Sequence, residues 1–172
     1  GFHNGVAFEN LASSKERVIV REDGIFLSIP DGFSIEGTSF ENDLLLVQDK
    51  ETKLYGSCDS EGYCAIPPQF EDADSFQNGY APISQSGKWS HIDSNGNVCS
   101  PAVFDSPYHF ESERAIAVKN GSPVLIDTSG TILKALDSSL TYDGFLPEGI
   151  ALFGSRFYTC LLYTSDAADD LT

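Results

Sequence analysis

Short apolar runs, separated by Gly, Asn, Asp and Ser, make up most of the chain. The runs are rich in aromatic and β-branched residues, and none keeps the spacing of three and four residues that marks an amphipathic helix. None approaches the ~18 consecutive apolar residues that a membrane-spanning helix needs. The pattern therefore predicts an all-β fold of short antiparallel strands.

A phrase that begins with Phe recurs along the chain, and a polar segment and an apolar run follow each copy. The spacings between successive copies are 38, 36, 34 and 35 residues. A fixed period of this length is the signature of a tandem repeat, in which neighbouring units bury a shared core. The copies begin at Phe2, Phe40, Phe76, Phe110 and Phe145.

A second phrase, Asp-x-x-Gly, keeps step with the first. It begins at Asp59, Asp93 and Asp127, at intervals of 34 residues, and 21–24 is a degenerate first copy. Asp followed by Gly three positions later predicts a type I turn closed by a left-handed Gly, which joins two strands with a bulge. In that register the residue before the Asp faces the residue two after the Gly, and we expect all four pairs to point into a core. The pairs are Val20 with Phe26, Cys58 with Cys64, Ile92 with Val98, and Ile126 with Ile132.

Each repeat is interpreted as a three-stranded meander: one strand after the Phe, one entering the turn and one leaving it. Prolines follow the third strand, at 67–68 and at 101, and should end its pairing because proline lacks an N–H. We expect one array over residues 1–159, stacked in an open superhelical or propeller-like arrangement. The repeats span about 2–39 (repeat one), 40–75 (two), 76–109 (three), 110–144 (four) and 145–159 (five, incomplete).

The segment 62–81, followed by 87–96, closely resembles the WG-containing bacterial β-repeat. The resemblance covers about residues 1–159 and is strongest over 55–130. It implies a tandem β-repeat without established catalytic residues. The Trp-Gly dipeptide that names the family is altered in each copy, to Tyr55-Gly56, Trp89-Ser90 and Pro123-Val124.

Both ends of the sequence carry signs of truncation. The chain has no Met, even at position 1, so we interpret it as a fragment. Residues 160–172 break the repeat and resemble a translated sequencing adapter, and we expect them to be a non-native tail outside the fold.

The charge is strongly acidic, with 26 Asp and Glu against 10 Lys and Arg and a formal net charge of -16. Such a chain repels phosphate backbones and anionic lipid, so we expect no nucleic-acid partner. Hydrophobic residues make up 41%, including 12 Phe and 7 Tyr, which is enough to build a packed core.

The cysteines leave two alternatives. Cys58 and Cys64 face each other in the expected register, either as a disulfide or as two thiols that fill an apolar slot. A zinc site is not predicted, because there is no C-x-x-C motif and Cys99 falls one residue beyond the slot of Cys64.

The sequence contains other candidate sites, but structural roles explain their residues better. Residues 93–97 imitate half of a calcium loop, but the Gly comes early and no Glu follows at the twelfth position, which favours a plain turn. The histidines His3, His91 and His109 are scattered, and we expect His91 at the surface or against Trp89. We predict no catalytic, cofactor-binding or metal-binding residues.

These observations favour a non-enzymatic binding scaffold for a protein or peptide. The alternative is a carbohydrate- or substrate-binding appendage of a larger secreted or cell-envelope enzyme. Exposed Trp or Tyr along one groove would favour a carbohydrate, and a flat acidic face would favour a basic protein.

Overall fold

The computed structural model describes residues 6–10, 17–22, 24, 26–27, 29–37, 40–138, 142–145, 151–153 and 156–158 of the chain. Every regular element among them is a β-strand, which confirms the all-β prediction. In this part of the chain no helix is long and apolar enough to cross a membrane. The expected tail, 160–172, lies outside the described residues, as does His3.

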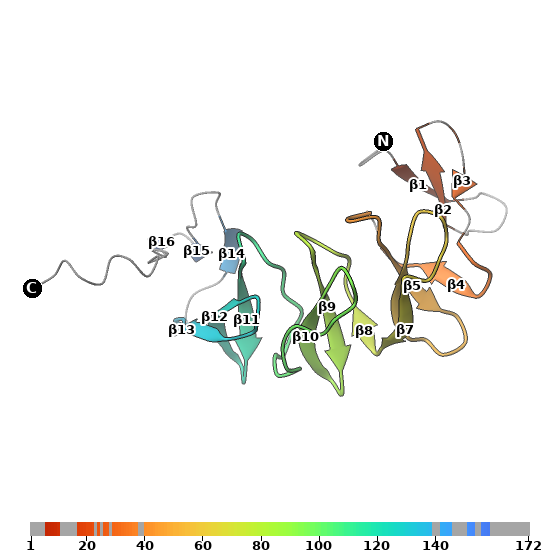
Figure 1. Cartoon of the computed structure of the whole chain (residues 1–172). Helices are drawn as coiled ribbons and strands as arrows, with labels where there is room; N and C mark the ends of the chain where they lie inside the picture. The colour runs from red at the N-terminus through yellow and green to blue at the C-terminus, as the bar shows by residue number, and fades with distance from the viewer. Residues whose placement is uncertain are drawn as a thin grey trace, which may run out of the picture. The chain divides into compact units, whose positions relative to one another are not determined.

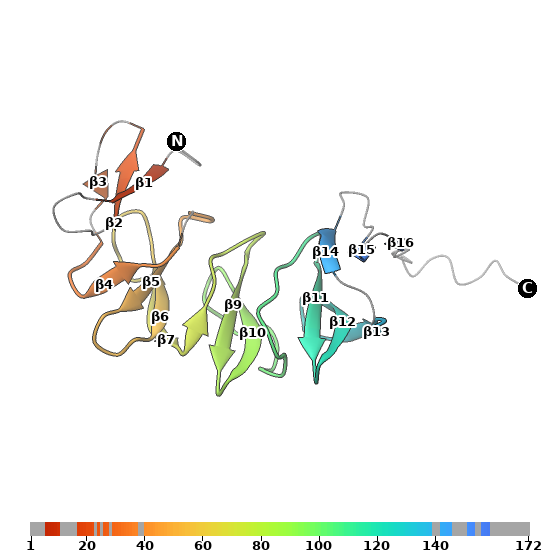
Figure 2. The same ribbon diagram turned by 180° about the vertical axis from the view of Figure 1, so that it is seen from behind.

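The chain divides into two compact parts, Gly1–Ala135 and Leu136–Thr172. The second holds an antiparallel sheet of β14 (Tyr142–Phe145), β15 (Ala151–Phe153) and β16 (Arg156–Tyr158). In the first, antiparallel sheets of three or four strands follow one another in chain order (Figures 1 and 2). They are β1 (Val6–Asn10), β2 (Arg17–Arg21) and β3 (Phe26–Leu27); β4 (Phe33–Ile35), β5 (Leu45–Asp49), β6 (Tyr55–Cys58) and β7 (Ile66–Phe70); β8 (Asp72–Ala73), β9 (Tyr80–Gln85) and β10 (Lys88–Asp93); and β11 (Arg114–Lys119), β12 (Ser122–Asp127) and β13 (Ile132–Ala135).

The Asp-x-x-Gly phrase forms the predicted turn in repeats two, three and four. In each copy the Gly N–H donates to the carbonyl oxygen of the Asp, at 2.9 to 3.1 Å. The Asp Oδ1 accepts from the backbone N–H groups two and four positions further on, at 2.9 to 3.0 Å. The Gly φ angles are positive, a region that glycine enters at little cost; they are 86° at Gly62, 82° at Gly96 and 77° at Gly130.

The predicted register is confirmed where the sheets pair these residues directly: Val20 with Phe26, Ile92 with Val98, and Ile126 with Ile132. In repeat two the Asp59 N–H donates to the Tyr63 carbonyl oxygen at 2.9 Å, as the same turn does in repeats three and four. That bond brings the preceding Cys58 and the following Cys64 to the equivalent opposed positions.

The expectation that both members of each pair are buried is wrong. Ile92 and Ile126 are buried, but their partners Val98 and Ile132 are 49% and 41% exposed. The third strand lies at the sheet edge and contains one extra residue: Ile126 pairs with Ile132 while Leu125 pairs with Lys134, so Leu133 has no pairing position. This bulge turns the start of the strand towards solvent.

Two-residue hairpin turns, which the sequence did not lead us to expect, recur in repeats two to four. Both central residues have positive φ, from 48° to 85°, which defines the type I′ turn that matches the twist of paired strands. They begin two residues after the Phe of repeats two, three and four, and they also join the two hairpin strands in repeats three and four, whereas the longer segment 50–54 joins β5 and β6 in repeat two. Their central residues are Asn42-Asp43, Asn78-Gly79, Ser86-Gly87, Ser112-Glu113 and Asn120-Gly121.

The last strand of a repeat pairs twice, first within its own repeat and then with the next one. β7 pairs with β6, and after the single residue Glu71 the same extended segment continues as β8 and pairs with β9. The expectation that proline ends the pairing is therefore wrong: Pro67 and Pro68 interrupt the ladder, which resumes where Phe70 pairs with Tyr55. Proline is tolerated there because β7 is an edge strand of its sheet.

The same crossing recurs between repeats three and four. Phe104 pairs with Trp89, and the next N–H, that of Asp105, donates to the Val118 carbonyl oxygen of β11 at 2.7 Å. The Asp105 carboxylate also accepts from the Gly121 N–H at 2.7 Å and binds the Lys88 ammonium group at 2.5 Å. Hydrogen bonding to Lys88 is the main cause of the lowered pKa of Asp105.

Candidate functional site

Two joints connect successive sheets, and their backbone contacts recur at the repeat period. Joint A lies between the sheet β4–β7 and the sheet β8–β10, and joint B between β8–β10 and β11–β13. In joint A the turn glycine of repeat three, Gly96, packs on Ile66. In joint B the equivalent Gly130 packs on Ser100, each residue being 34 positions further along.

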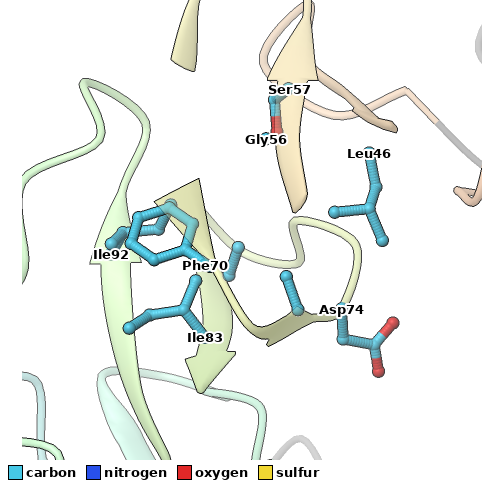
Figure 3. Close-up of a pocket in the computed structure, with 9 residues that line it drawn as sticks. Leu46, Gly56, Ser57, Phe70, Asp74, Ile83 and Ile92 are labelled. Atoms are coloured by element: carbon cyan, nitrogen blue, oxygen red, sulfur yellow. The ribbon is translucent and has the colours of Figure 1, made fainter. Parts of the chain in front are cut away.

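Joint A contains a small apolar cavity (Figure 3). Its volume is about 10 Å³, and it is partly open to solvent. Figure 3 shows Phe70, Ile83 and Ile92 grouped on one side, with the Asp74 carboxylate directed away from them. The lining residues are Leu46, Gly56, Ser57, Phe70, Ala73, Asp74, Ala81, Ile83 and Ile92.

Joint B fills the equivalent space with larger side chains. Buried Ile83 and Ala81 of joint A correspond to Ala117 and Ala115, which are also buried. The loss of volume at Ala117 makes room for aromatic rings from other positions. Three of the remaining cavity positions carry larger side chains in joint B: Gly56 is replaced by Ser90, Ser57 by His91, and Asp74 by Tyr108. Leu46 corresponds to Pro82, because Leu46 pairs with Ser57 as Pro82 pairs with His91.

His91 is the centre of joint B and is fully buried, so the expectation of a surface position is wrong. Its Nε2 lies 2.7 Å from the carbonyl oxygen of Thr128, which can only accept, so Nε2 carries the proton. Its Nδ1 then accepts from the Tyr108 hydroxyl at 2.8 Å. The ring also contacts Phe110 at a centroid distance of 4.6 Å and Tyr80 at 5.5 Å.

The neutral form of His91 is favoured by its surroundings. Burial is the largest influence and lowers the pKa of His91, while the Thr128 carbonyl and the Asp127 charge act in the opposite direction. Because both ring nitrogens are occupied by structural hydrogen bonds, this histidine acts as a link between repeats three and four rather than as a catalytic base.

Position 56 and its equivalents explain why the repeat dipeptide varies. A Cβ on Gly56 would overlap the Ile66 carbonyl oxygen and the Pro68 nitrogen, because β7 passes directly over it. At the equivalent position the Ser90 hydroxyl donates to the Ser100 carbonyl oxygen at 2.5 Å. Ser100 is the equivalent of Ile66, so the same carbonyl that excludes a side chain in one repeat accepts a hydrogen bond in the next.

Comparison with known families agrees with this assignment of the dipeptide. A family model described as a WG containing repeat matches residues 55–89 and again residues 92–122. Residues 55–122 contain two WG repeats. The first match begins at Tyr55-Gly56, the dipeptide over which β7 passes. No curated protein matches the chain, and no solved structure matches it.

The remaining candidates from the sequence have structural roles in the WG repeats. In the calcium-like segment, the Asp93 carboxylate accepts from the N–H groups of Asn95 and Asn97 and from the Asn97 side chain, which lower its pKa. The plain-turn interpretation of this segment is therefore confirmed. The His109 Nε2 lies 3.2 Å from an Asp74 carboxylate oxygen.

The three cysteines of the described WG repeats are free thiols in different environments. Cys58 is buried, Cys64 is exposed, and Cys99 is half-buried. Burial is the main cause that raises the pKa of Cys58 to about 12. The structure thus holds the pair as two thiols, the second of the alternatives derived from the sequence.

Exposed apolar side chains collect at one place in the WG repeat. Among the described residues, the large hydrophobic side chains that are exposed all lie on the segment leaving the Asp-x-x-Gly turn. The register predicted from the sequence placed Cys64, Val98 and Ile132 of this set in the core, and the structure exposes them. This edge row comprises Tyr63 (68% exposed), Val98 (49%), Ile132 (41%) and Leu133 (45%), together with the exposed Cys64.

Proposed function

We propose that the WG-repeat array is a non-enzymatic scaffold that binds an extended, basic segment of another protein along its edge row. One observation carries the proposal: the equivalent positions Cys64, Val98 and Ile132 are exposed in three successive repeats, with exposed Tyr63 and Leu133 beside them. A single exposed apolar residue is ordinary, but a series that recurs with the repeat supplies several anchor points for one partner.

The charge of the chain supports a basic partner. The formal net charge is -16, and the turns next to the edge row carry Asp59, Glu61, Asp93 and Asp127. Complementary charge accelerates association and selects against acidic competitors. A segment with apolar side chains on one face and Lys or Arg on the other fits both features.

The packing of the aromatic residues favours a protein over a carbohydrate partner. Trp89 packs against the core of repeat four, together with Tyr80 and Val103. Tyr108 is buried as well, so within the described residues Tyr63 is the large aromatic side chain free to stack on a sugar. A glycan groove needs several such platforms in a row.

A peptide-binding measurement tests the proposal. The probe is a fluorescent peptide of alternating Lys and Val, and its matched control alternates Glu and Val. We expect the basic peptide to bind, salt to weaken the binding, and Val98→Ser combined with Ile132→Ser to weaken it about tenfold or more. Gln85→Ser, at an exposed position on the other end of the β9–β10 hairpin, should leave it unchanged.

Equal affinity for the two peptides, or binding unaffected by the double substitution, would contradict the proposal. Binding of soluble oligosaccharides in place of the peptide would favour the carbohydrate alternative. Circular dichroism of each variant separates loss of binding from loss of fold.

A further inference from the structure

Cys58 and Cys64 lie on the two sides of one turn and face each other. The Asp59 N–H donates to the Tyr63 carbonyl oxygen at 2.9 Å, and the Gly62 N–H to the Asp59 carbonyl oxygen at 3.1 Å. These bonds hold the residues that flank them in opposed positions on the same face. The Cys64 thiol donates to the Ile66 carbonyl oxygen at 3.6 Å.

The next repeat shows the same turn with a fully bracketed pair. There Ile92 faces Val98, between a hydrogen bond from the Asp93 N–H to Asn97 and one from the Cys99 N–H to His91. Such a non-hydrogen-bonded pair has Cα atoms about 4.5 Å apart, within the range that a disulfide spans. In repeat two the bond from the Asp59 N–H is retained, but the Ala65 N–H donates to the Tyr63 carbonyl oxygen at 2.9 Å, so backbone bonds hold the cysteine slot on the turn side alone.

The two thiols differ in their access to solvent. Cys64 is exposed, whereas Cys58 is completely buried in a core cluster with Ile19, Leu45 and Val47. A dissolved reagent therefore meets Cys64 first. Cys99, one residue beyond the equivalent of Cys64, donates its thiol to the Asn97 carbonyl oxygen at 3.4 Å.

From this juxtaposition we propose that Cys58 and Cys64 are a dithiol site that exchanges with small-molecule disulfides such as oxidised glutathione. Cys64 loses its proton to solvent and attacks the glutathione disulfide, which forms a mixed disulfide and releases one glutathione thiolate. Cys58 then gives up its proton, attacks the Cys64 sulfur and displaces the second glutathione thiolate. Both thiolates take up protons, so two protein thiols are oxidised and one disulfide is reduced to two glutathione thiols.

The product would close the Asp59–Gly62 turn covalently without a change of register. The turn already holds the two strands by backbone hydrogen bonds, so the disulfide adds a constraint rather than a new conformation. The site is independent of peptide binding, because it requires only the two thiols and the turn between them.

The reaction should be slow at neutral pH and accelerate as the pH rises. Burial raises the pKa of both thiols, that of Cys58 to about 12, and the thiolate is the reactive form. Below the pKa of Cys64 the rate of the first step should rise about tenfold for each pH unit.

The test treats the full chain with oxidised glutathione, blocks the remaining thiols and maps the peptides by mass spectrometry. We expect one internal link between Cys58 and Cys64, reversed by dithiothreitol. Cys58→Ile should trap a stable glutathione adduct on Cys64, and Cys64→Val should leave Cys58 unmodified. The double variant Cys58→Ile with Cys64→Val copies the Ile92–Val98 pair and is the folded control that forms no link.

Three results would overturn the proposal: a persistent glutathione adduct on Cys64 of the unsubstituted chain, a link from either residue to Cys99 or Cys160, or no reaction at any pH. Order of alkylation provides a second measurement on the unsubstituted protein, which needs no variant to fold. Iodoacetamide should modify Cys64 before Cys58, and the reverse order would contradict the assigned roles.

Discussion

Joints A and B are built from the same backbone contacts but have different interiors. In both, a turn glycine packs on the outgoing strand of the preceding repeat, at Gly96 on Ile66 and at Gly130 on Ser100. Joint A leaves a cavity of about 10 Å³ among small and aliphatic side chains. Joint B fills the same positions with a hydrogen-bonded group centred on His91.

The difference separates what the repeat requires from what it tolerates. Both joints retain the turn, the register and the crossing strand, which is the strand that pairs first within its own repeat and then with the next one. These are therefore the parts that hold successive repeats together. The side chains inside the joint change in compensating ways, as when Ile83 becomes Ala117 and Ser57 becomes His91. Cores accept such exchanges if the total volume is kept.

The largest effect should come from Gly56→Ala in joint A. The new Cβ would overlap the Ile66 carbonyl oxygen, and the backbone of β7 would have to move away. We expect a loss of about 3 kcal/mol or more in the free energy of unfolding, measured by urea denaturation. Ser90→Ala at the equivalent position of joint B already accommodates a Cβ and should cost about 1 kcal/mol. Equal midpoints for Gly56→Ala and the unsubstituted protein would show that β7 does not press on this position.

Removing the central ring of joint B should have the next largest effect. His91→Ala deletes a buried ring and leaves the Tyr108 hydroxyl and the Thr128 carbonyl oxygen without partners. We expect a cost of about 3 kcal/mol in thermal or urea unfolding. The matched control in joint A, Ser57→Ala, removes one small side chain and should cost less than about 1 kcal/mol. Similar losses for the two variants would mean that His91 is not a link between repeats.

Adding volume at equivalent alanines should cost different amounts in the two joints. Ala115→Val introduces two methyl groups into the filled joint B, and we expect a loss of about 1 to 2 kcal/mol. Ala81→Val adds the same volume beside the small cavity of joint A, which takes up part of it, and should cost less than about 1 kcal/mol. Melting temperatures of the two variants measure the contrast, which would disappear if joint A closed up without a cavity.

The smallest expected effect is a pH dependence that belongs to joint B. The pKa of His91 is lowered by burial, so below its ordinary value of 6.5 the unfolded chain binds a proton more readily than the folded one. Stability should therefore be full above pH 6.5 and fall as the pH decreases from there. The turn carboxylates Asp93 and Asp127 also have lowered pKa values, and their contribution is lost below about 3.8. In His91→Gln the unfolding midpoint should depend less on pH between pH 4 and 6.5. If the pH dependence is the same as in the unsubstituted protein, it arises from other titratable groups.

The sequence predicted the features that depend on neighbouring residues. Asp at the start of the turn and Gly at its end determine the hydrogen bonds and the positive φ locally, so the turn and its register followed from the repeat alone. The prolines were misjudged because their effect depends on which edge of the sheet β7 occupies.

The candidate site was less accessible from the sequence, since it depends on contacts between repeats. The place of His91 is fixed by Tyr108 and by Thr128, 37 residues further along, and nothing around His91 in the sequence indicates that distant carbonyl. The exposure of Val98 and Ile132 depends on one extra residue in an edge strand, and alternation of apolar residues does not reveal such a bulge.

Because the crossing strand pairs in two repeats, the repeat in the sequence and the sheet in the fold begin and end at different residues. A segment of the length matched at 55–89 begins within one hairpin and ends within the next, so it carries half of each of two sheets. Duplication of that segment would supply every new half-sheet with a partner, whereas duplication of one complete sheet would cut the crossing strand in two. An array of this kind can lengthen or shorten by whole periods during evolution, but a single inserted residue in the crossing strand would turn its side chains to the opposite face.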